Sequence, residues 1–231
     1  MNKLLANISV KTGLTVVLAI FGLLIMVVAF IGHQSGKRGG ESLEALDDIA
    51  MHQMLPLVRA QRSVGFAQLA YMNAVVSAEN GQQQRTQAYL AEADGFLQSA
   101  QRYFAEFEAS SPRDINGELA DAVITDFHAV MQQGLVPLAA AVTSGNDVQL
   151  AGARQAISPL NQEFISSSMA FNDFLEDYGD QLVANYERDM QMFGYIDIAV
   201  IIVALLTIVL VRMAMVRSIV KPLDEAVVHF E

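Results

Sequence analysis

Residues 147–216 constrain the fold most strongly, because they join an amphipathic stretch to an apolar one without a break that would end a helix. Between residues 157 and 182 apolar side chains recur at steps of three and four, which is typical of a helix packed in a bundle. Residues 198–211 are apolar on every side, as in a lipid-embedded helix. Gly194 costs only roughly 1 kcal/mol, and Pro159 leaves open a separate short segment at the start. We therefore predict a helical rod on the order of 100 Å long.

Two apolar stretches fit a membrane crossing. Residues 12–32 contain no charged side chain and reach the roughly 20 residues that a crossing needs. Residues 192–214 form the second stretch, with Asp197 near one end and Arg212 near the other. The first stretch exceeds the roughly 7–15 apolar residues of a signal peptide and precedes no small-x-small cleavage site. We therefore predict two transmembrane helices, the first of them a retained anchor.

Basic residues at the two ends of the chain predict its orientation, because cytoplasmic loops are enriched in Lys and Arg. Residues 1–11 and 215–231 are then cytoplasmic, and residues 33–191 form an external domain. The basic residues used are Lys3, Lys11, Arg212, Arg217 and Lys221.

The external segment has helical periodicity throughout. Helices are predicted over residues 43–76, 82–108, 118–142 and from 147 onward, with a turn at 79–81, a loop at 110–117 and a turn at 143–146. Pro137 should kink or shorten the third helix, and Asp147 can cap the fourth. Because no run alternates like a strand, we predict an all-α fold. It is an antiparallel up-down-up-down four-helix bundle whose first and last helices continue into the two transmembrane helices.

Composition excludes several function classes. The chain of 231 residues is 53% hydrophobic with a net charge of −11, and acids outnumber bases in residues 33–191. This charge argues against a nucleic-acid partner and against an anionic membrane surface. Cysteine is absent, so packing and not disulfides must hold the external domain together.

A seam of eight residues on the first bundle helix suggests where a ligand binds. Its members follow alternating steps of four and three, the spacing used where two helices pack along their length. Arg62 occupies a position that should be apolar, Gly65 beside it leaves room, and Arg59 lies three residues earlier. Two guanidiniums one turn apart could clamp a carboxylate; alternatively, Arg62 bends to water along its aliphatic stem. The seam comprises Met51, Leu55, Val58, Arg62, Gly65, Leu69, Met72 and Val76.

Other side chains give weaker signals. Tyr71 and Asn73 could supply an aromatic contact or hydrogen bonds to a ligand, although Tyr71 also fits the core. The four histidines are scattered without the spacing of a zinc site, and no phosphate loop, nucleophile motif or paired-carboxylate motif is present. We predict no enzymatic activity, no cofactor and no metal.

The segment after the second span reads Arg-Ser-Ile-Val-Lys-Pro-Leu over residues 217–223. This pattern resembles the opening of a HAMP domain, a cytoplasmic signal-relay module, and residues 215–231 would be its start. With the two spans and the four-helix external domain, the chain resembles the sensory half of a methyl-accepting chemotaxis receptor of the bacterial inner membrane.

The resemblance implies a homodimer in the membrane lipid, with a small ligand held at or near the interface of the two first helices. An occupied site would shift the last helix slightly toward the cytoplasm and control a kinase or adaptor there. The enteric aspartate and serine receptors hold the ligand carboxylate with arginines of the first helix. Without gaps those arginines fall on Gly65, Ala70 and Ala74, whereas Arg59 and Arg62 match them only if a gap is allowed.

Further ligand contacts in that family lie around a proline near the start of the last helix, which Pro159 loosely matches. The resemblance therefore adds Ser158, Asn161 and Gln162 as candidates, although solvated surface also explains them. Two alternatives stay open: the same front end attached to a histidine kinase or cyclase, and a bundle that binds a partner protein instead of a small ligand.

Overall fold

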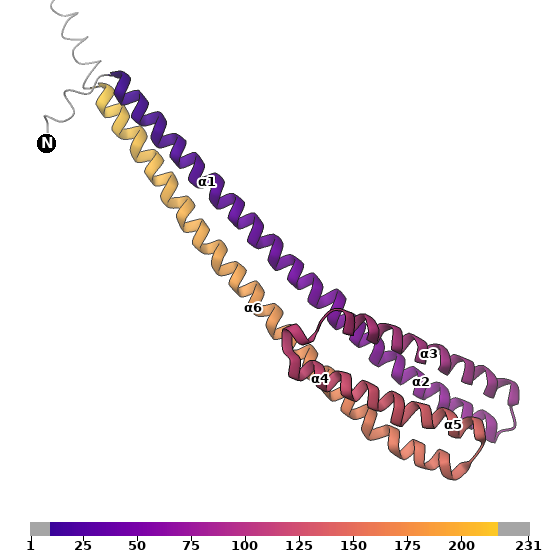
Figure 1. The fold of residues 1–231 in the computed structure, drawn as a ribbon. Helices are drawn as coiled ribbons and strands as arrows, with labels where there is room; N and C mark the ends of the chain where they lie inside the picture. The colour runs from indigo at the N-terminus through magenta and orange to yellow at the C-terminus, as the bar shows by residue number, and fades with distance from the viewer. Residues whose placement is uncertain (1–9, 217–231) are drawn as a thin grey trace, which may run out of the picture. The chain divides into compact units, whose positions relative to one another are not determined.

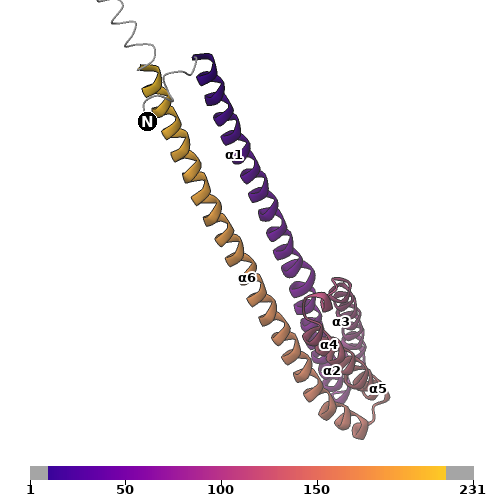
Figure 2. The same ribbon diagram turned by 60° about the vertical axis from the view of Figure 1, so that its left-hand side comes forward.

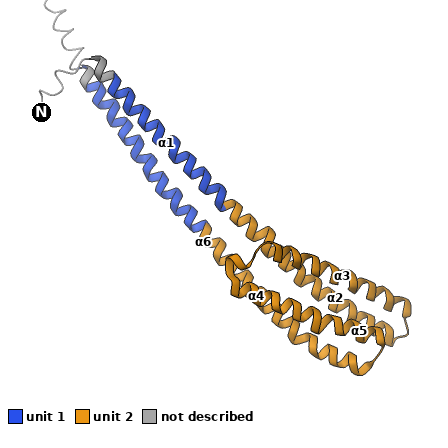
Figure 3. Cartoon of the chain, viewed as in Figure 1, with its two compact units in different colours: residues 1–42, 183–231 blue, residues 43–182 orange. Residues whose placement is uncertain are grey.

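A computed structural model describes residues 10–216, without the side chains of residues 10–14, 214 and 215. The HAMP-like motif at 217–223 lies outside these residues. The chain divides into two compact units, Met1–Ser42 with Val183–Glu231, and Leu43–Leu182 (Figure 3). We refer to them as the membrane unit and the outer unit.

The described residues are almost entirely helical. The elements are α1 Val10–Asp47, the π-helix η1 Asp48–Met54, α2 Leu55–Glu79, α3 Gln83–Ala109, α4 Arg113–Ala129, the π-helix η2 Val130–Leu135, α5 Val136–Ser144 and α6 Asp147–Met215.

The outer unit is a four-helix bundle, which confirms the predicted fold class. Its helices are η1 with α2, α3, the run α4–η2–α5, and the first part of α6, and they lie side by side in both ribbon views (Figures 1 and 2). Each of the three short connections contains a residue in the left-handed region: Gly81 at φ 68°, Ser111 at φ 55° and Gly145 at φ 64°. Short connections favour antiparallel neighbours.

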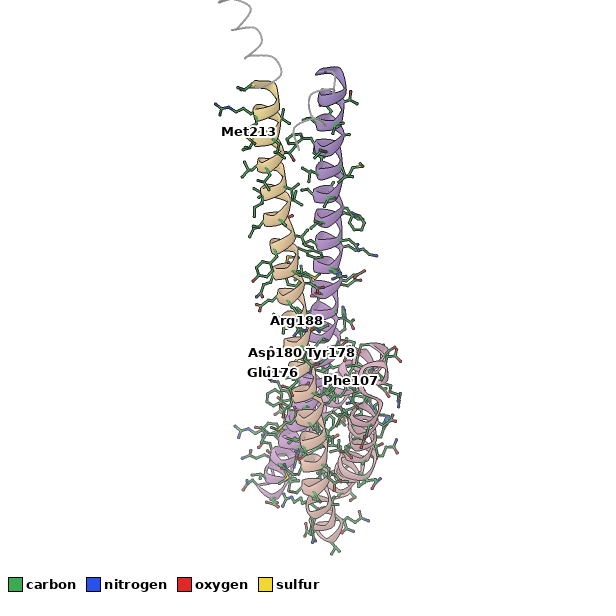
Figure 4. All side chains as sticks on the ribbon, turned by 90° about the vertical axis from the view of Figure 1, so that its left-hand side faces the viewer. Phe107, Glu176, Tyr178, Asp180, Arg188 and Met213 are labelled. Carbon is green, nitrogen blue, oxygen red and sulfur yellow. The ribbon has the colours of Figure 1, made fainter. Side chains whose placement is uncertain are left out.

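Aromatic rings fill the middle of the bundle. Phe104 of α3 stacks on Phe127 of α4 with ring centres 3.7 Å apart, and Phe164 of α6 meets Phe127 edge-on at 5.5 Å. Phe107, labelled in Figure 4, contacts Phe171 edge-on at 5.4 Å. All five side chains are buried, so three of the four helices are joined by one aromatic cluster.

The third bundle helix differs from its prediction at both ends. The predicted loop over residues 110–117 is shorter, because α4 already begins at Arg113. Its first turn breaks at Asn116, where φ is −150° and ψ is 97°. The Asn116 side-chain oxygen accepts a hydrogen bond from the Leu119 amide at 3.1 Å, so this residue caps the helix that follows. Before Pro137 the helix widens into η2, which is how the chain accommodates a proline that lacks a donor.

The last helix differs from its prediction in its cap. Asn146, not Asp147, caps α6, because its side-chain oxygen accepts hydrogen bonds from the amides of Val148 and Gln149, each at 3.1 Å. No separate first segment forms, since α6 continues through Pro159 and Gly194 as one helix.

The membrane unit pairs α1 with α6. Arg38 forms an ion pair with Asp189, and its guanidinium carbon lies 5.7 Å from the centre of the Phe193 ring. The Ser35 hydroxyl contacts the Met190 sulfur at 3.5 Å. In the sequence, these contacts adjoin the end of residues 12–32 and the start of residues 192–214.

Two helices are long and apolar enough to cross a membrane, Thr15–Glu79 and Asp147–Met213. Only 11% and 6% of their most apolar windows are buried within the chain. Core helices of soluble proteins bury such windows, so this exposure is consistent with a protein of the inner membrane.

Candidate functional site

The two faces of α2 differ in their chemistry. The buried face is built from small residues, with Ala60, Ala67 and Ala74 fully buried, which lets neighbouring helices approach closely. The opposite face is the seam found in the sequence, and its large apolar side chains face outward. Their exposed fractions are 53% for Met51, 42% for Val58, 56% for Leu69 and 51% for Val76.

Arg62 and Gly65 lie on this exposed seam. Within residues 10–216 no side chain forms an ion pair or hydrogen bond with Arg62, and a Cβ added at Gly65 would meet no atom within 4 Å. The seam therefore presents one unpaired positive charge, beside a position with free space, between apolar neighbours.

Arg59 takes part in a different contact, toward α3. Its guanidinium carbon lies 5.5 Å from the centre of the Tyr103 ring, and that of Arg102 lies 4.8 Å from the same centre. Both distances are within the range of a cation–π interaction. The structure thus adds Arg102 and Tyr103 to the candidate residues. No sequence signal singles them out, because the contact depends on the register between two helices.

Tyr71 faces the core and not the seam. It is only 1% exposed, and its hydroxyl donates a hydrogen bond to Asp94 of α3 at 3.2 Å. Burial raises the pKa of Tyr71 to about 12, and the negative charge of Asp94 and the hydrogen bond to it act in the same direction. Asn73, two residues on, is half-buried.

The α6 candidates flank Pro159. Ser158 and Gln162 are exposed and Asn161 is half-buried, and the Gln162 amide nitrogen donates to the Ser166 hydroxyl at 3.5 Å. No hydrogen bond or ion pair joins these three residues to α2 within the described part of the chain.

The register of the antiparallel helices nevertheless places the α6 candidates near the level of the α2 candidates. A methyl carbon of Leu46 lies 3.5 Å from the Cβ position of Gly179. Counting along the antiparallel helices from this contact brings Asn161 and Gln162 near the level of Arg62. Farther along α6, Tyr178 packs against the core, whereas Glu176 and Asp180 are exposed (Figure 4).

A separate open pocket of about 420 Å³ lies between α5 and α6. It contains none of the predicted site residues. Its lining is made of Gln133, Pro137, Ala140, Ala141, Gln149, Gly152, Ala153 and Ala156. Within residues 10–216 no group of three His, Cys, Asp or Glu side chains could hold a metal ion.

Comparison with known proteins gives one finding that bears on this arrangement. The sequence model of a family described as Tar ligand binding domain homologue matches residues 4–178. The match covers the first apolar segment and nearly all of the outer unit. No curated protein and no solved structure matches the chain.

Proposed function

Since this chain belongs to the family of Tar ligand binding domain homologues, it contains a chemoreceptor sensory domain, and we propose that two copies bind a small carboxylate ligand between their α2 seams. The observation that carries the proposal is an unpaired arginine, Arg62, on an exposed apolar helix face. In this proposal the bundle is periplasmic and both chain ends are cytoplasmic.

A second copy of the chain is the occupant that fits the seam. Seam residues at steps of four and three are what two helices need to pack along their length. Such a packing would cover Met51, Val58, Leu69 and Val76, each at least 42% exposed in the single chain. A symmetric pair places the same surface of each copy against the other, so one helix face supplies both halves of the interface.

Arg62 supplies the charge that selects the ligand. Two-fold symmetry brings two Arg62 side chains to the same level of the paired seams, where apolar neighbours exclude water. Two such guanidiniums repel each other unless an anion lies between them, and a carboxylate accepts their forked hydrogen bonds. Arg59 lies one turn away but contacts Tyr103 of α3, and Asn161 and Gln162 lie near the level of Arg62 in the bundle.

Helix α6 is the proposed route of the signal. It belongs to both units and runs without a break from Asp147 to Met215. A ligand shifts such a helix only by binding one position of it better than the other, and coupling of about 1–3 kcal/mol is typical. The shift would reach the HAMP-like segment and control a chemotaxis kinase, or a histidine kinase or cyclase output in its place.

A thermal-shift screen tests the proposal. The full chain in lipid nanodiscs is heated with a panel of amino acids and organic acids at constant ionic strength. We expect at least one carboxylate to raise the unfolding temperature, and Arg62→Ala to abolish the rise. The control variant Arg85→Ala removes an exposed arginine at the start of α3, and the rise in unfolding temperature should persist in it. No response of the wild type to any acid, or an unchanged response in Arg62→Ala, contradicts the proposal.

A further inference from the structure

A second positively charged site lies on the outer unit, between α2 and α3. Its centre is the half-buried Tyr103 ring, which two guanidiniums approach: Arg59 from α2, with its carbon 5.5 Å from the ring centre, and Arg102 from α3, at 4.8 Å. Adjacent helical residues do not normally face each other. The Arg102 guanidinium nevertheless lies over the ring of its neighbour.

Neither guanidinium has an acidic partner within the described part of the chain. Among the ion pairs of residues 10–216 the outer unit pairs Arg113 with Asp121, but none involves Arg59 or Arg102. Glu106 lies one turn beyond Arg102 on the same helix, at a spacing that often supports an ion pair, and still forms none. Two positive charges thus share one ring in a unit where acids outnumber bases.

The contact with the ring prepares both arginines for a ligand. A guanidinium that lies against a ring loses rotamer freedom before any ligand arrives, so less entropy is lost on binding. Its N–H groups remain available for forked hydrogen bonds, because no hydrogen bond or ion pair within residues 10–216 engages them. Both side chains are exposed to solvent, so a ligand can reach them in a single copy of the chain.

We propose that Arg59, Arg102 and Tyr103 form a second ligand site, which binds a small dicarboxylate. Each guanidinium pairs with one carboxylate, and the Tyr103 hydroxyl is an additional donor at the edge of the ring. A dianion also relieves the repulsion between the two cations, which a monocarboxylate does only in part. This site goes beyond the proposed function, since it needs neither the seam nor a second copy.

Titration calorimetry on the full chain in nanodiscs tests the site, with malonate, succinate and glutarate as probes and butyrate as the monoanion. We expect at least one dicarboxylate to bind and butyrate to bind about tenfold more weakly or not at all. Arg102→Gln should weaken dicarboxylate binding by about tenfold or more. Arg102→Lys should weaken this binding less, because lysine keeps the positive charge and loses only the forked hydrogen bonds.

Two variants separate this site from the seam. Arg62→Gln should leave dicarboxylate binding to the second site unchanged, and Arg85→Gln controls for the loss of one exposed charge on α3. If none of the three dicarboxylates binds, the second site is overturned. It is also overturned if dicarboxylate binding is abolished in Arg62→Gln and unchanged in Arg102→Gln. The last result would place the ligand on the seam and so support the proposed function, whereas binding lost only in Arg102→Gln would support the second site alone.

Discussion

Gln53 provides the sharpest test of the packing in the outer unit. It lies in η1 and is 1% exposed, and neither its amide oxygen nor its amide nitrogen has a hydrogen-bond partner within the described residues. Its neighbours in sequence include the buried Ile49 and Leu57. A buried polar group without a partner is a cost to the folded state, and Gln53→Leu removes it while keeping a side chain of similar size.

The size of the effect follows from this environment. An unsatisfied buried donor or acceptor costs about 1–3 kcal/mol, so Gln53→Leu should raise the free energy of unfolding by roughly that amount. One kcal/mol corresponds to about 4 °C for a domain of this size. Because leucine has nearly the volume of the amide side chain, we therefore expect the unfolding temperature of the outer unit to rise by roughly 4–12 °C.

Scanning calorimetry of the full chain in nanodiscs measures this change. Gln98→Leu is the matched control, since Gln98 is exposed on α3 and an exposed substitution changes stability by only about 0.5 kcal/mol or less. An unfolding temperature that falls in Gln53→Leu, or stays equal to that of the control, would show that the amide is hydrogen-bonded in the folded protein. It would refute the reasoning.

Three other variants give independent predictions. Because the folded-state pKa of Tyr71 is raised from 10.0 to about 12, its contribution to stability is complete below pH 10. It is lost as pH rises from 10 to 12, by about 2–3 kcal/mol; alkaline denaturant titrations of Tyr71→Phe should lack this part of the loss. Phe164→Ala should lower the free energy of unfolding by about 3–5 kcal/mol, measured by urea titration, whereas a loss under about 1 kcal/mol would contradict the aromatic core. Leu69→Cys should form a disulfide-linked dimer on oxidation, seen on a non-reducing gel, because the chain has no other cysteine; Gln101→Cys, exposed on α3, should link poorly, and equal linking of both would contradict the seam.

Periodicity is sufficient to predict the bundle and to place the seam residues on one helix face, because both depend on the local repeat of apolar side chains. The steps of four and three from Met51 to Val76 select one helix face whatever the rest of the chain does. The two π-helices were not predictable in this way, since they arise where a proline must be accommodated within a packed helix. Asn146 was missed as a cap because both it and Asp147 have suitable side chains, and only backbone geometry distinguishes them.

Some residues of the candidate site could likewise be predicted from the sequence, and others could not. Arg62 and Gly65 could be proposed from the sequence because they interrupt a repeat, and a repeat is visible in sequence. The cation–π contacts of Tyr103 depend on how α2 and α3 are offset along their axes, which single-sequence patterns do not encode. Tyr71 could be assigned to core or ligand from its position, and its hydrogen bond to Asp94 accounts for its placement in the core.

Continuity of α6 between the outer unit and the second apolar segment is the claim on which signal transmission depends. Hydrogen–deuterium exchange of the full chain in nanodiscs measures it directly, through the peptides that cover residues 175–200. We predict protection at every backbone amide in that range, as in an unbroken helix. A run of amides there that exchanges at the rate of an unstructured chain would contradict the claim, because a flexible joint cannot pass a displacement from the ligand to the cytoplasm.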